Sequence, residues 1–425
     1  MKNYKMPAGQ LTSPQKIRKL FSLCWISYVF AYLGRLNYAA CLVEITRTEG
    51  WTKSEAGLIA TGFFIFYGLG QLVNGYLGDR ISPKLMVGIG LSLSGLINLI
   101  FPFFHAIPII MLLWCINGFV QSMIWSPLVR MISERMPCEK RQQACVNMNS
   151  TVPVGTLAVY GLSALLVYLG DWQLVFFSSG TLLLTMSVVW FRGISSLEKG
   201  LEPVVSQAHK AQETAPAAKV PVGKLVILSA LPLCLAGLMM QGMLKDGVTT
   251  WIPTFLEENF GLTAAASILC TTIVPIINLG GVYLGSWANR RFFKNEVLTA
   301  FVFFLTALGS LLLLTFYPLH SAVFSLLLLT VTTTFMMGIN TVLASMMPSY
   351  YVQYGVCSTI TGLLNGSAYV GSAFSSYGSG AVVQYFGWNT ILYCWCICAA
   401  AGALFCSFCF KKWGRFRNYS LYKHP

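Results

Sequence analysis

Long apolar stretches alternate with short polar turns along almost the whole chain. About twelve stretches reach the roughly 20 residues that a helix needs to cross a membrane. None shows the alternating polarity that is typical of membrane β-strands. The pattern therefore predicts an all-α integral membrane protein with twelve transmembrane helices, at approximately 18–43, 55–77, 85–104, 107–132, 143–168, 172–192, 224–256, 262–288, 296–316, 320–347, 355–386 and 387–410.

The composition supports this prediction. The 425 residues are 56% hydrophobic and only 10% charged, and the mean hydropathy is +0.66. A soluble domain usually carries about 25% charged residues. The chain starts with a polar segment, and its first apolar stretch is too long for the core of a signal peptide, so we expect no cleaved signal.

The longest polar stretch divides the apolar chain in two. Residues 193–222 are rich in Ala, Pro, Gln and Glu, a composition typical of a linker, and we expect it to be cytoplasmic. The division predicts an N-terminal six-helix bundle at 1–192 and a C-terminal six-helix bundle at 223–425.

The two halves look like repeats of each other. Tyr-Leu-Gly follows the second helix at 76–78 and the eighth helix at 283–285. Tyr-Leu-Gly-Asp-Trp at 168–172 has a counterpart, Tyr-Phe-Gly-Trp, at 385–388. The two offsets are about 207 and about 217 residues. Weak internal symmetry of this kind is typical of transporters that bind their substrate near the midplane, where the repeats meet.

The basic residues are distributed unevenly. The formal net charge is +14, from 28 basic and 14 acidic side chains. If successive helices cross the membrane in opposite directions, the loop charges gather on one side, and only Arg47 and Lys53 lie on the other. This positive-inside distribution places both termini in the cytoplasm. We therefore expect a multi-pass protein of the cell inner (plasma) membrane, in contact with lipid and with no nucleic-acid partner.

Two basic residues lie inside predicted helices, Arg35 in the first and Lys245 in the seventh. A charge at bilayer depth costs several kcal/mol and rarely persists without a partner or a function. The two residues are 210 positions apart, between the two repeat offsets, which makes them counterparts in the two halves. We interpret them as groups that bind an anion.

Each cation also has a structural alternative. Arg35 could pair with Glu44 on the same helix, and Lys245 could pair with Asp246, although adjacent side chains on a helix point apart. Apart from a few acidic residues near helix ends, Glu44 and Asp246 are the only ones inside the predicted spans, which argues against proton coupling. The four histidines fall in loops or tails, so no histidine relay is predicted.

The turn Gly-x-Leu-Gly-Asp-Arg-x-x-Pro-Lys at 75–84 resembles the signature between helices 2 and 3 of the major facilitator superfamily. The resemblance implies the major facilitator fold, with two pseudo-symmetric six-helix bundles. Gly75 and Gly78 would let helices approach closely. Asp79 would cap and pair across the cytoplasmic face and stabilise the outward-open state. Together with Arg80, these residues form the predicted gating motif.

Within that superfamily, the chain is similar over nearly its whole length to the organophosphate:phosphate antiporters, typified by bacterial glycerol-3-phosphate and hexose-6-phosphate transporters. The resemblance implies that Arg35 binds phosphate. The motifs that carry it are Tyr28-x-x-x-Tyr32-x-x-Arg35-x-Asn37-Tyr38, Phe66-Tyr67-Gly68, Gly118-Phe119-x-Gln121-x-x-x-Trp125-x-Pro127, and the run from Gly362 through Tyr369-Val370-Gly371 to Tyr385-Phe386-Gly387-Trp388.

The chain departs from this family at several polar positions. Lys245 replaces the second phosphate-binding arginine, and lysine offers a point charge instead of a planar fork. Gln71 corresponds to a frequent lysine, Ser150 to a histidine of the glycerol-3-phosphate transporters and Asn340 to a tyrosine. A known family substrate therefore cannot be transferred to this chain.

We predict a secondary transporter, not an enzyme, that exchanges a phosphate ester for inorganic phosphate by alternating access. Two alternatives stay open: a carboxylate or sugar-acid carrier of the same fold, and a membrane sensor of sugar phosphate that does not transport. We expect a monomer with no cofactor and no metal. The predicted substrate-binding residues are Arg35, Lys245, Tyr28, Tyr32, Tyr67, Gln121, Asn149, Ser150, Asn340 and Tyr369.

Some of these residue types have simpler interpretations. The tyrosines at 28, 32 and 67 could serve packing or the membrane interface. Tyr38 and Trp51 are interpreted as residues of the interfacial aromatic belt. Cys406-x-x-Cys409 has metal-like spacing but lies among apolar residues, so we interpret both cysteines as small buried hydrophobes.

Overall fold

The computed structural model describes residues 11–51, 53–199, 222–262, 270–271, 273–317 and 321–422. All regular elements in these residues are helical, so the predicted all-α class is confirmed. The chain divides into two compact units, which we describe separately. The first comprises Met1–Val220 with Tyr351–Leu363, and the second comprises Pro221–Tyr350 with Leu364–Pro425. Most of the predicted linker lies outside the described residues.

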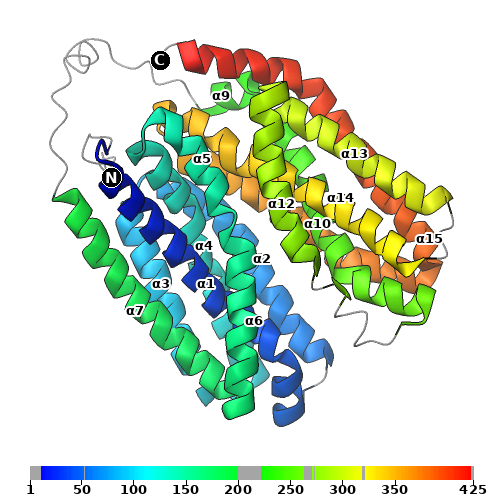
Figure 1. Ribbon diagram of the computed structural model, residues 1–425. Coiled ribbons are helices and arrows are strands. Elements are labelled where there is room, and N and C mark those ends of the chain that lie inside the picture. Colours follow the sequence, from blue (N-terminus) through cyan, green and yellow to red (C-terminus); the bar gives the residue numbers. More distant parts are fainter. Residues whose placement is uncertain are drawn as a thin grey trace. The chain divides into compact units, whose positions relative to one another are not determined.

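The helices of the first unit agree with the predicted spans except at two places. The predicted fifth helix is divided at Asn149 and Ser150, and the predicted sixth continues to Glu198. The elements are α1 (Pro14–Glu49), α2 (Lys53–Gly78), α3 (Pro83–Ile100), the short 3-10 helix η1 (Phe101–Phe103), α4 (Ile107–Arg135), α5 (Cys138–Met148), α6 (Thr151–Leu169) and α7 (Trp172–Glu198) (Figure 1).

The second unit contains several irregular helical turns. Ala230 adopts a left-handed conformation (φ 52°) and interrupts the predicted seventh helix. Gly387 (φ 79°, ψ 177°) kinks the last helix between the predicted eleventh and twelfth spans. The elements are α9 (Val222–Leu228), α10 (Leu231–Phe260), α12 (Ile273–Ala288), the π-helix η2 (Asn289–Phe293), α13 (Glu296–Phe316), α14 (Ala322–Asn340), the π-helix η3 (Thr341–Met346), the 3-10 helix η4 (Met347–Tyr354) and α15 (Cys357–Tyr422), whose first turns belong to the first unit.

Many of the described helices are suited to a membrane. The helices α1 and α10 are long, at 36 and 30 residues, but they carry the charged residues Arg35 and Lys245. They are not among the helices that are both long enough and apolar enough to cross a membrane by these two criteria. Eight described segments satisfy both criteria, namely Glu55–Gly78, Pro83–Phe103, Ile107–Arg135, Glu139–Leu169, Trp172–Glu198, Glu296–Phe316, Ala322–Tyr354 and Val382–Asn418.

Local chemistry explains several helix ends. Gly50 (φ 69°) ends α1 and Gly261 (φ 67°) ends α10, because glycine adopts the left-handed conformation without steric cost. The side chain of Asn295 accepts hydrogen bonds from the backbone N–H groups of Val297 and Leu298, each at 3.1 Å, and so caps α13.

Aromatic side chains form part of the core of the first unit. Phe101 stacks on Phe176 with ring centroids 4.4 Å apart, and Trp114 contacts both rings. Tyr38 joins this cluster, because it lies 5.4 Å from Trp114 and donates a hydrogen bond to the carbonyl of Ala56 at 2.9 Å. The interpretation of Tyr38 as an interfacial residue was wrong, since its side chain is buried.

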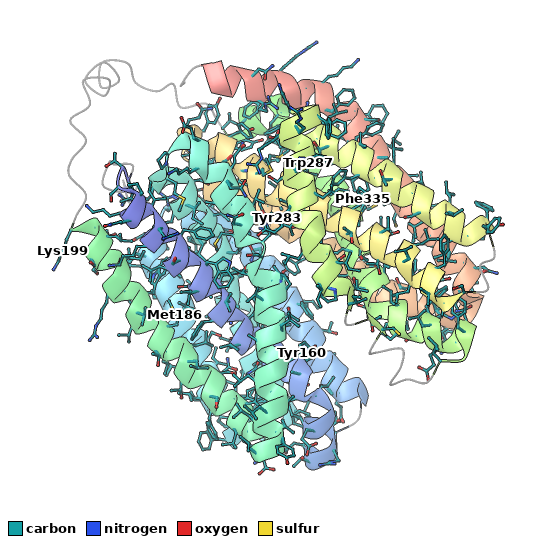
Figure 2. All side chains as sticks on the ribbon, viewed as in Figure 1. Tyr160, Met186, Lys199, Tyr283, Trp287 and Phe335 are labelled. Atoms are coloured by element: carbon teal, nitrogen blue, oxygen red, sulfur yellow. The ribbon has the colours of Figure 1, made fainter. Side chains whose placement is uncertain are left out.

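Apolar side chains are also exposed on several helices. Tyr160 of α6 and Tyr283 and Trp287 of α12 are about half exposed (Figure 2). Lipid tails are as apolar as these side chains, so exposure in a membrane carries little penalty, and helix association depends instead on close packing of small residues.

Such a contact joins α2 and α4 in the first unit. A Cβ atom on Gly118 of α4 would overlap the backbone carbonyl oxygen of Phe63 in α2 and would lie 3.2 Å from the Cα and carbonyl carbon of that residue. These backbone atoms cannot move aside as a flexible side chain could. Gly161 of α6, in contrast, has open space where a Cβ would stand.

We therefore expect Gly118→Ala to destabilise the protein by about 1–3 kcal/mol through overpacking. The measurement is thermal unfolding of the detergent-solubilised protein. Gly161→Ala is the matched control and should leave the melting temperature unchanged or slightly raised. Equal melting temperatures for both variants would contradict the close contact.

Candidate functional site

Arg35 is buried in the first unit and faces aromatic rings. Only 7% of the residue is exposed. Its guanidinium carbon lies 3.9 Å from the ring centroid of Tyr67 in α2 and 5.5 Å from that of Tyr32 in α1. The negative face of an aromatic ring attracts a cation within about 6 Å. The two tyrosines therefore compensate part of the cost of holding the arginine inside the unit.

The face of α1 that carries Arg35 also carries Tyr28, which contacts Tyr32. Tyr28, Tyr32 and Arg35 follow the i, i+4, i+7 spacing that places residues on one side of a helix. Tyr28 lies edge-on to Tyr32 at 5.5 Å and contacts Trp125 of α4 at 4.6 Å. The structure thus brings together four of the predicted binding residues of this half: Arg35, Tyr28, Tyr32 and Tyr67.

Gln71 lies one turn beyond Tyr67 on α2 and is fully buried. Its carbonyl oxygen accepts a hydrogen bond from Ser126 at 3.3 Å. Within the described part of the chain, its amide nitrogen Nε2 has no hydrogen-bond partner. A buried donor without a partner costs about 1–3 kcal/mol, so this nitrogen is suited to a bound acceptor.

A polar network holds α1 at the turn before Arg35. The amide of Gln121 donates to the carbonyl of Ala31 at 3.0 Å, and the amide of Asn117 donates to the carbonyl of Gly34 at 2.8 Å. Gly34 has no Cβ, and one would lie 2.9 Å from Asn98 Nδ2. Gln121 is thus placed against the helix backbone, and the network determines where Arg35 projects.

Glu44, which the sequence offered as an alternative partner of Arg35, forms an ion pair with Arg47. Glu44 Oε1 lies 2.6 Å from Arg47 Nη2, one turn further along α1. The Arg47 side chain is 78% exposed, so this pair is a surface ion pair of small energetic value.

Asn149 and Ser150 lie at the break between α5 and α6. The amide of Asn149 donates to the carbonyl of Cys145 at 3.2 Å. The hydroxyl of Ser150 accepts a hydrogen bond from Trp25 Nε1 at 2.9 Å and donates to the carbonyl of Asn147 at 2.7 Å. Both predicted binding residues therefore have local partners, and the hydrogen bond between Ser150 and Trp25 joins the break to α1.

Lys245 forms an ion pair in the second unit. Its Nζ lies 3.2 Å from Oδ1 of Asp246, and the two side chains are 27% and 33% exposed. The expectation that neighbouring side chains on a helix point apart is therefore wrong here, because the long lysine side chain reaches back to the adjacent carboxylate. Ser372 of α15 donates a hydrogen bond to the other carboxylate oxygen, Oδ2.

The other predicted residues of this unit are Asn340 and Tyr369. Both are partly buried. Asn340 ends α14 and is followed directly by the π-helix η3. Short π-helical turns occur frequently at functional sites, and the sequence contains no pattern from which this turn could have been predicted. Tyr369 lies one turn before Ser372 on α15.

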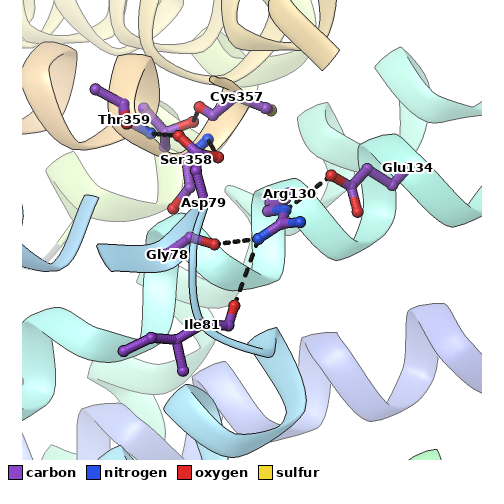
Figure 3. A network of polar contacts seen from close by, with 9 residues as sticks. Gly78, Asp79, Ile81, Arg130, Glu134, Cys357, Ser358 and Thr359 are labelled. Carbon is purple, nitrogen blue, oxygen red and sulfur yellow. Dashed lines mark hydrogen bonds and ion pairs between the residues drawn. The ribbon is translucent and has the colours of Figure 1, made fainter. Parts of the chain in front are cut away.

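The gating motif meets the first turn of α15, within the first unit (Figure 3). Asp79 Oδ1 accepts a hydrogen bond from the backbone N–H of Ser358 at 2.8 Å, and Oδ2 accepts one from Thr359 at 2.7 Å. The first backbone N–H groups of a helix have no partner within it and carry a partial positive charge. The carboxylate supplies both the acceptors and the opposite charge.

Glycines make this contact possible. A Cβ on Gly75 would lie 2.8 Å from the Cα of Gly362, and a Cβ on Gly78 would lie 3.0 Å from the side-chain Cβ of Ser358. Any larger residue at either position would therefore hold Asp79 away from the helix end.

Arg130 of α4 holds the turn that carries Asp79. It donates hydrogen bonds to the carbonyls of Gly78 and, at 3.4 Å, Ile81, and it pairs with Glu134 at 2.7 Å. The guanidinium of Arg80 instead lies over the ring of Tyr76, 3.3 Å from its centroid. Arg130, which sequence reasoning did not single out, therefore supports the motif more directly than Arg80.

Burial raises the pKa of Asp79, while hydrogen bonds from Thr359 and Ser358 and the charge of Arg130 partly oppose the increase. An enclosed carboxyl with a raised pKa binds a proton more tightly than an exposed one. Protonation of Asp79 therefore stabilises, at low pH, the conformation in which this side chain is enclosed. That contribution to stability is lost as the pH rises through the raised pKa.

The residues that hold other side chains and helices in position were not predicted from the sequence. Asn98, Asn117, Arg130 and Ser372 are polar residues inside apolar helices, and that contrast was the available signal. No group of three or more histidine, cysteine or acidic side chains suited to a metal ion occurs in the described segments.

The chain matches the model of the Major Facilitator Superfamily over residues 24–359. The membrane sensor protein UhpC of Salmonella typhimurium is 25% identical, over 91% of this chain and 90% of its own. A probable hexose phosphate transport protein of Chlamydia muridarum is 22% identical over 93% of each chain, and the glycerol-3-phosphate transporter of Bacillus subtilis is 26% identical over 87% of each. These relatives confirm the resemblance to organophosphate:phosphate antiporters.

Solved structures show the same fold. The proton:xylose symporter XylE superposes with a TM-score of 0.73 at 15% identity, covering 92% of this chain and 95% of that one. The identity is too low to carry a substrate, so the likeness supports the predicted fold alone.

We expect Asp79→Ala to loosen the start of α15. Losing a side chain that caps a helix costs about 1 kcal/mol, or about a fivefold change in an equilibrium. The measurement is the rate at which maleimide labels Cys357, which is buried in the first turn of α15, followed by mass spectrometry of its peptide.

Asp171→Ala is the matched control. Asp171 is an exposed aspartate of the same unit, before α7. Labelling of Cys357 should be unchanged in that variant and about fivefold faster in Asp79→Ala. An unchanged rate in Asp79→Ala would show that the two hydrogen bonds do not hold the helix end.

Proposed function

Because the chain belongs to the Major Facilitator Superfamily, we propose that it is a secondary transporter that exchanges a phosphate ester for inorganic phosphate. Members of this family are transporters, in agreement with the expectation that the chain is not an enzyme. The observation that carries the proposal is the burial of Arg35 against Tyr67 and Tyr32 inside a long helix of a membrane protein.

The chemistry of Arg35 favours phosphate. A guanidinium presents five N–H donors in a planar fork that fits two phosphate oxygens at once, and such charge-assisted hydrogen bonds are roughly twice as strong as neutral ones. The Nε2 group of Gln71, one turn from Tyr67, has no partner among the described residues and would supply a further, neutral donor. The hexose phosphate and glycerol-3-phosphate relatives support a phosphate ester as the substrate class.

We assign the second charge to Lys245. In this proposal each half contributes one cation to the anion, and the halves alternate access to it. Binding of the anion offsets the mutual repulsion of the cations, so the loaded carrier changes state more readily than the empty one. Asp79 would stabilise the outward-open state through its contact with α15 and release that contact during each cycle.

The remaining predicted residues fall into two groups. Tyr28, Tyr32, Tyr67, Asn340 and Tyr369 are proposed to contact the organic part of the substrate. Gln121, Asn149 and Ser150 bind backbone carbonyls, and we propose that they position α1 and α6 around the substrate.

The charge distribution supports a location in the cell inner membrane with both termini in the cytoplasm. We also propose that the functional form is a monomer, since each chain carries both repeats and both cations.

A sensor is the second candidate, because UhpC is among the relatives. A sensor of this kind would bind phosphate esters without exchanging them. A carboxylate carrier of the same fold would exchange carboxylates and not phosphate.

Counterflow in proteoliposomes tests these candidates. Vesicles preloaded with inorganic phosphate should take up labelled phosphate, and external glycerol-3-phosphate or a hexose phosphate should compete. Exchange of a carboxylate without exchange of phosphate would refute the proposal, and phosphate-ester binding without exchange would favour a sensor.

We expect Arg35→Ala to reduce phosphate exchange at least about 30-fold, because removing a buried charged partner costs about 2 kcal/mol or more. Arg35→Lys should restore part of the activity, since it returns the charge without the fork. Arg192→Ala removes an exposed arginine of α7 and should exchange like the wild type. Normal exchange in Arg35→Ala would remove this residue from the site.

A further inference from the structure

Resting on the proposed function, we propose that Asp246 acts as an internal anion, which occupies Lys245 in the empty carrier and which the incoming phosphate must displace. Asp246 would position the side chain of Lys245 and compete with phosphate for it. The proposal concerns only residues of the second unit. The free energy with which Lys245 binds phosphate is then the difference between two ion pairs, the one with phosphate and the one with Asp246.

The geometry places the carboxylate between two partners. One oxygen, Oδ1, lies 3.2 Å from Lys245 Nζ, and the other, Oδ2, accepts the hydrogen bond from Ser372. Both charged side chains are about a third exposed. An incoming anion can therefore reach the lysine, and water can reach the carboxylate when it leaves.

Ser372 has more than one acceptor within reach. Its hydroxyl oxygen also lies 3.0 Å from the carbonyl of Ala368 and 3.4 Å from that of Gly242. A hydroxyl carries one hydrogen and rotates freely. When Asp246 moves away, the hydroxyl can donate to Ala368 instead, so release of the carboxylate leaves no buried donor unpaired.

Close packing of α10 on α15 fixes these positions. A Cβ on Gly242 would lie 2.8 Å from the carbonyl carbon of Ala368, and a Cβ on Gly371 would lie 2.8 Å from that of Met239. Both contacts lie in the turns just before Lys245 on α10 and Ser372 on α15, so they hold Ser372 beside Asp246.

The arrangement has a predictable effect on transport. A lysine that already has a carboxylate partner binds phosphate less tightly than an uncompensated lysine. It also releases phosphate faster, because the carboxylate can replace the departing anion. Asp246 should therefore raise both the half-saturation concentration and the maximal rate.

The test is phosphate counterflow with Asp246→Asn, which keeps a hydrogen-bond acceptor for Ser372 but removes the charge. We expect the half-saturation concentration for inorganic phosphate to fall about five- to tenfold and the maximal rate to fall with it. Asp246→Glu should restore wild-type values for both. If Asp246→Asn is not recovered as a folded protein, Asp246→Ser serves the same test.

Glu257→Gln is the matched control, because it neutralises an exposed carboxylate near the end of the same helix. It should not alter either constant. If wild-type protein exchanges phosphate and Asp246→Asn has an unchanged or higher half-saturation concentration, the role of Asp246 is refuted while the proposed function stands. If the wild type exchanges no phosphate, the proposed function itself fails.

Discussion

A cation inside a membrane protein must be compensated by the groups around it, and the arrangement of the first unit follows from that constraint at Arg35. The guanidinium lies against two tyrosine rings, one from α1 and one from α2. Amides from α4 hold the backbone of α1 one turn earlier, so that the arginine projects from a fixed position. The second unit meets the same constraint differently, with a carboxylate adjacent to its lysine.

Features that depend on helical spacing and on small residues were predictable from the sequence. The spacing of Tyr28, Tyr32 and Arg35 identified a shared helix face, and the glycines of the 75–84 turn indicated a close helix contact. Both features depend on residues that are near one another in the chain, where helical geometry alone determines their placement. The break at Gly387 was predictable for the same reason.

Contacts between distant residues were not predictable. Gln121 is 90 positions from Ala31, and Asp79 is 279 from Ser358, so only the packed helices show these partners. Tyr38 follows the pattern of an interfacial residue but is buried, because neighbouring helices supply Trp114 and a carbonyl acceptor. The pairing of Lys245 with Asp246 depends on the flexibility of one side chain, which a rule about helix faces does not include.

The contact between α10 and α15 has a consequence for how this protein could diversify. Gly242 and Gly371 face backbone atoms of the opposite helix, so mutation to any larger residue there would push the helices apart. The side chains of Lys245 and Asp246 are instead partly exposed, at 27% and 33%. New substrate ranges could therefore arise by exchanging side chains on a conserved helix pair, which would allow lineages to diverge widely in cargo while their architecture stays the same.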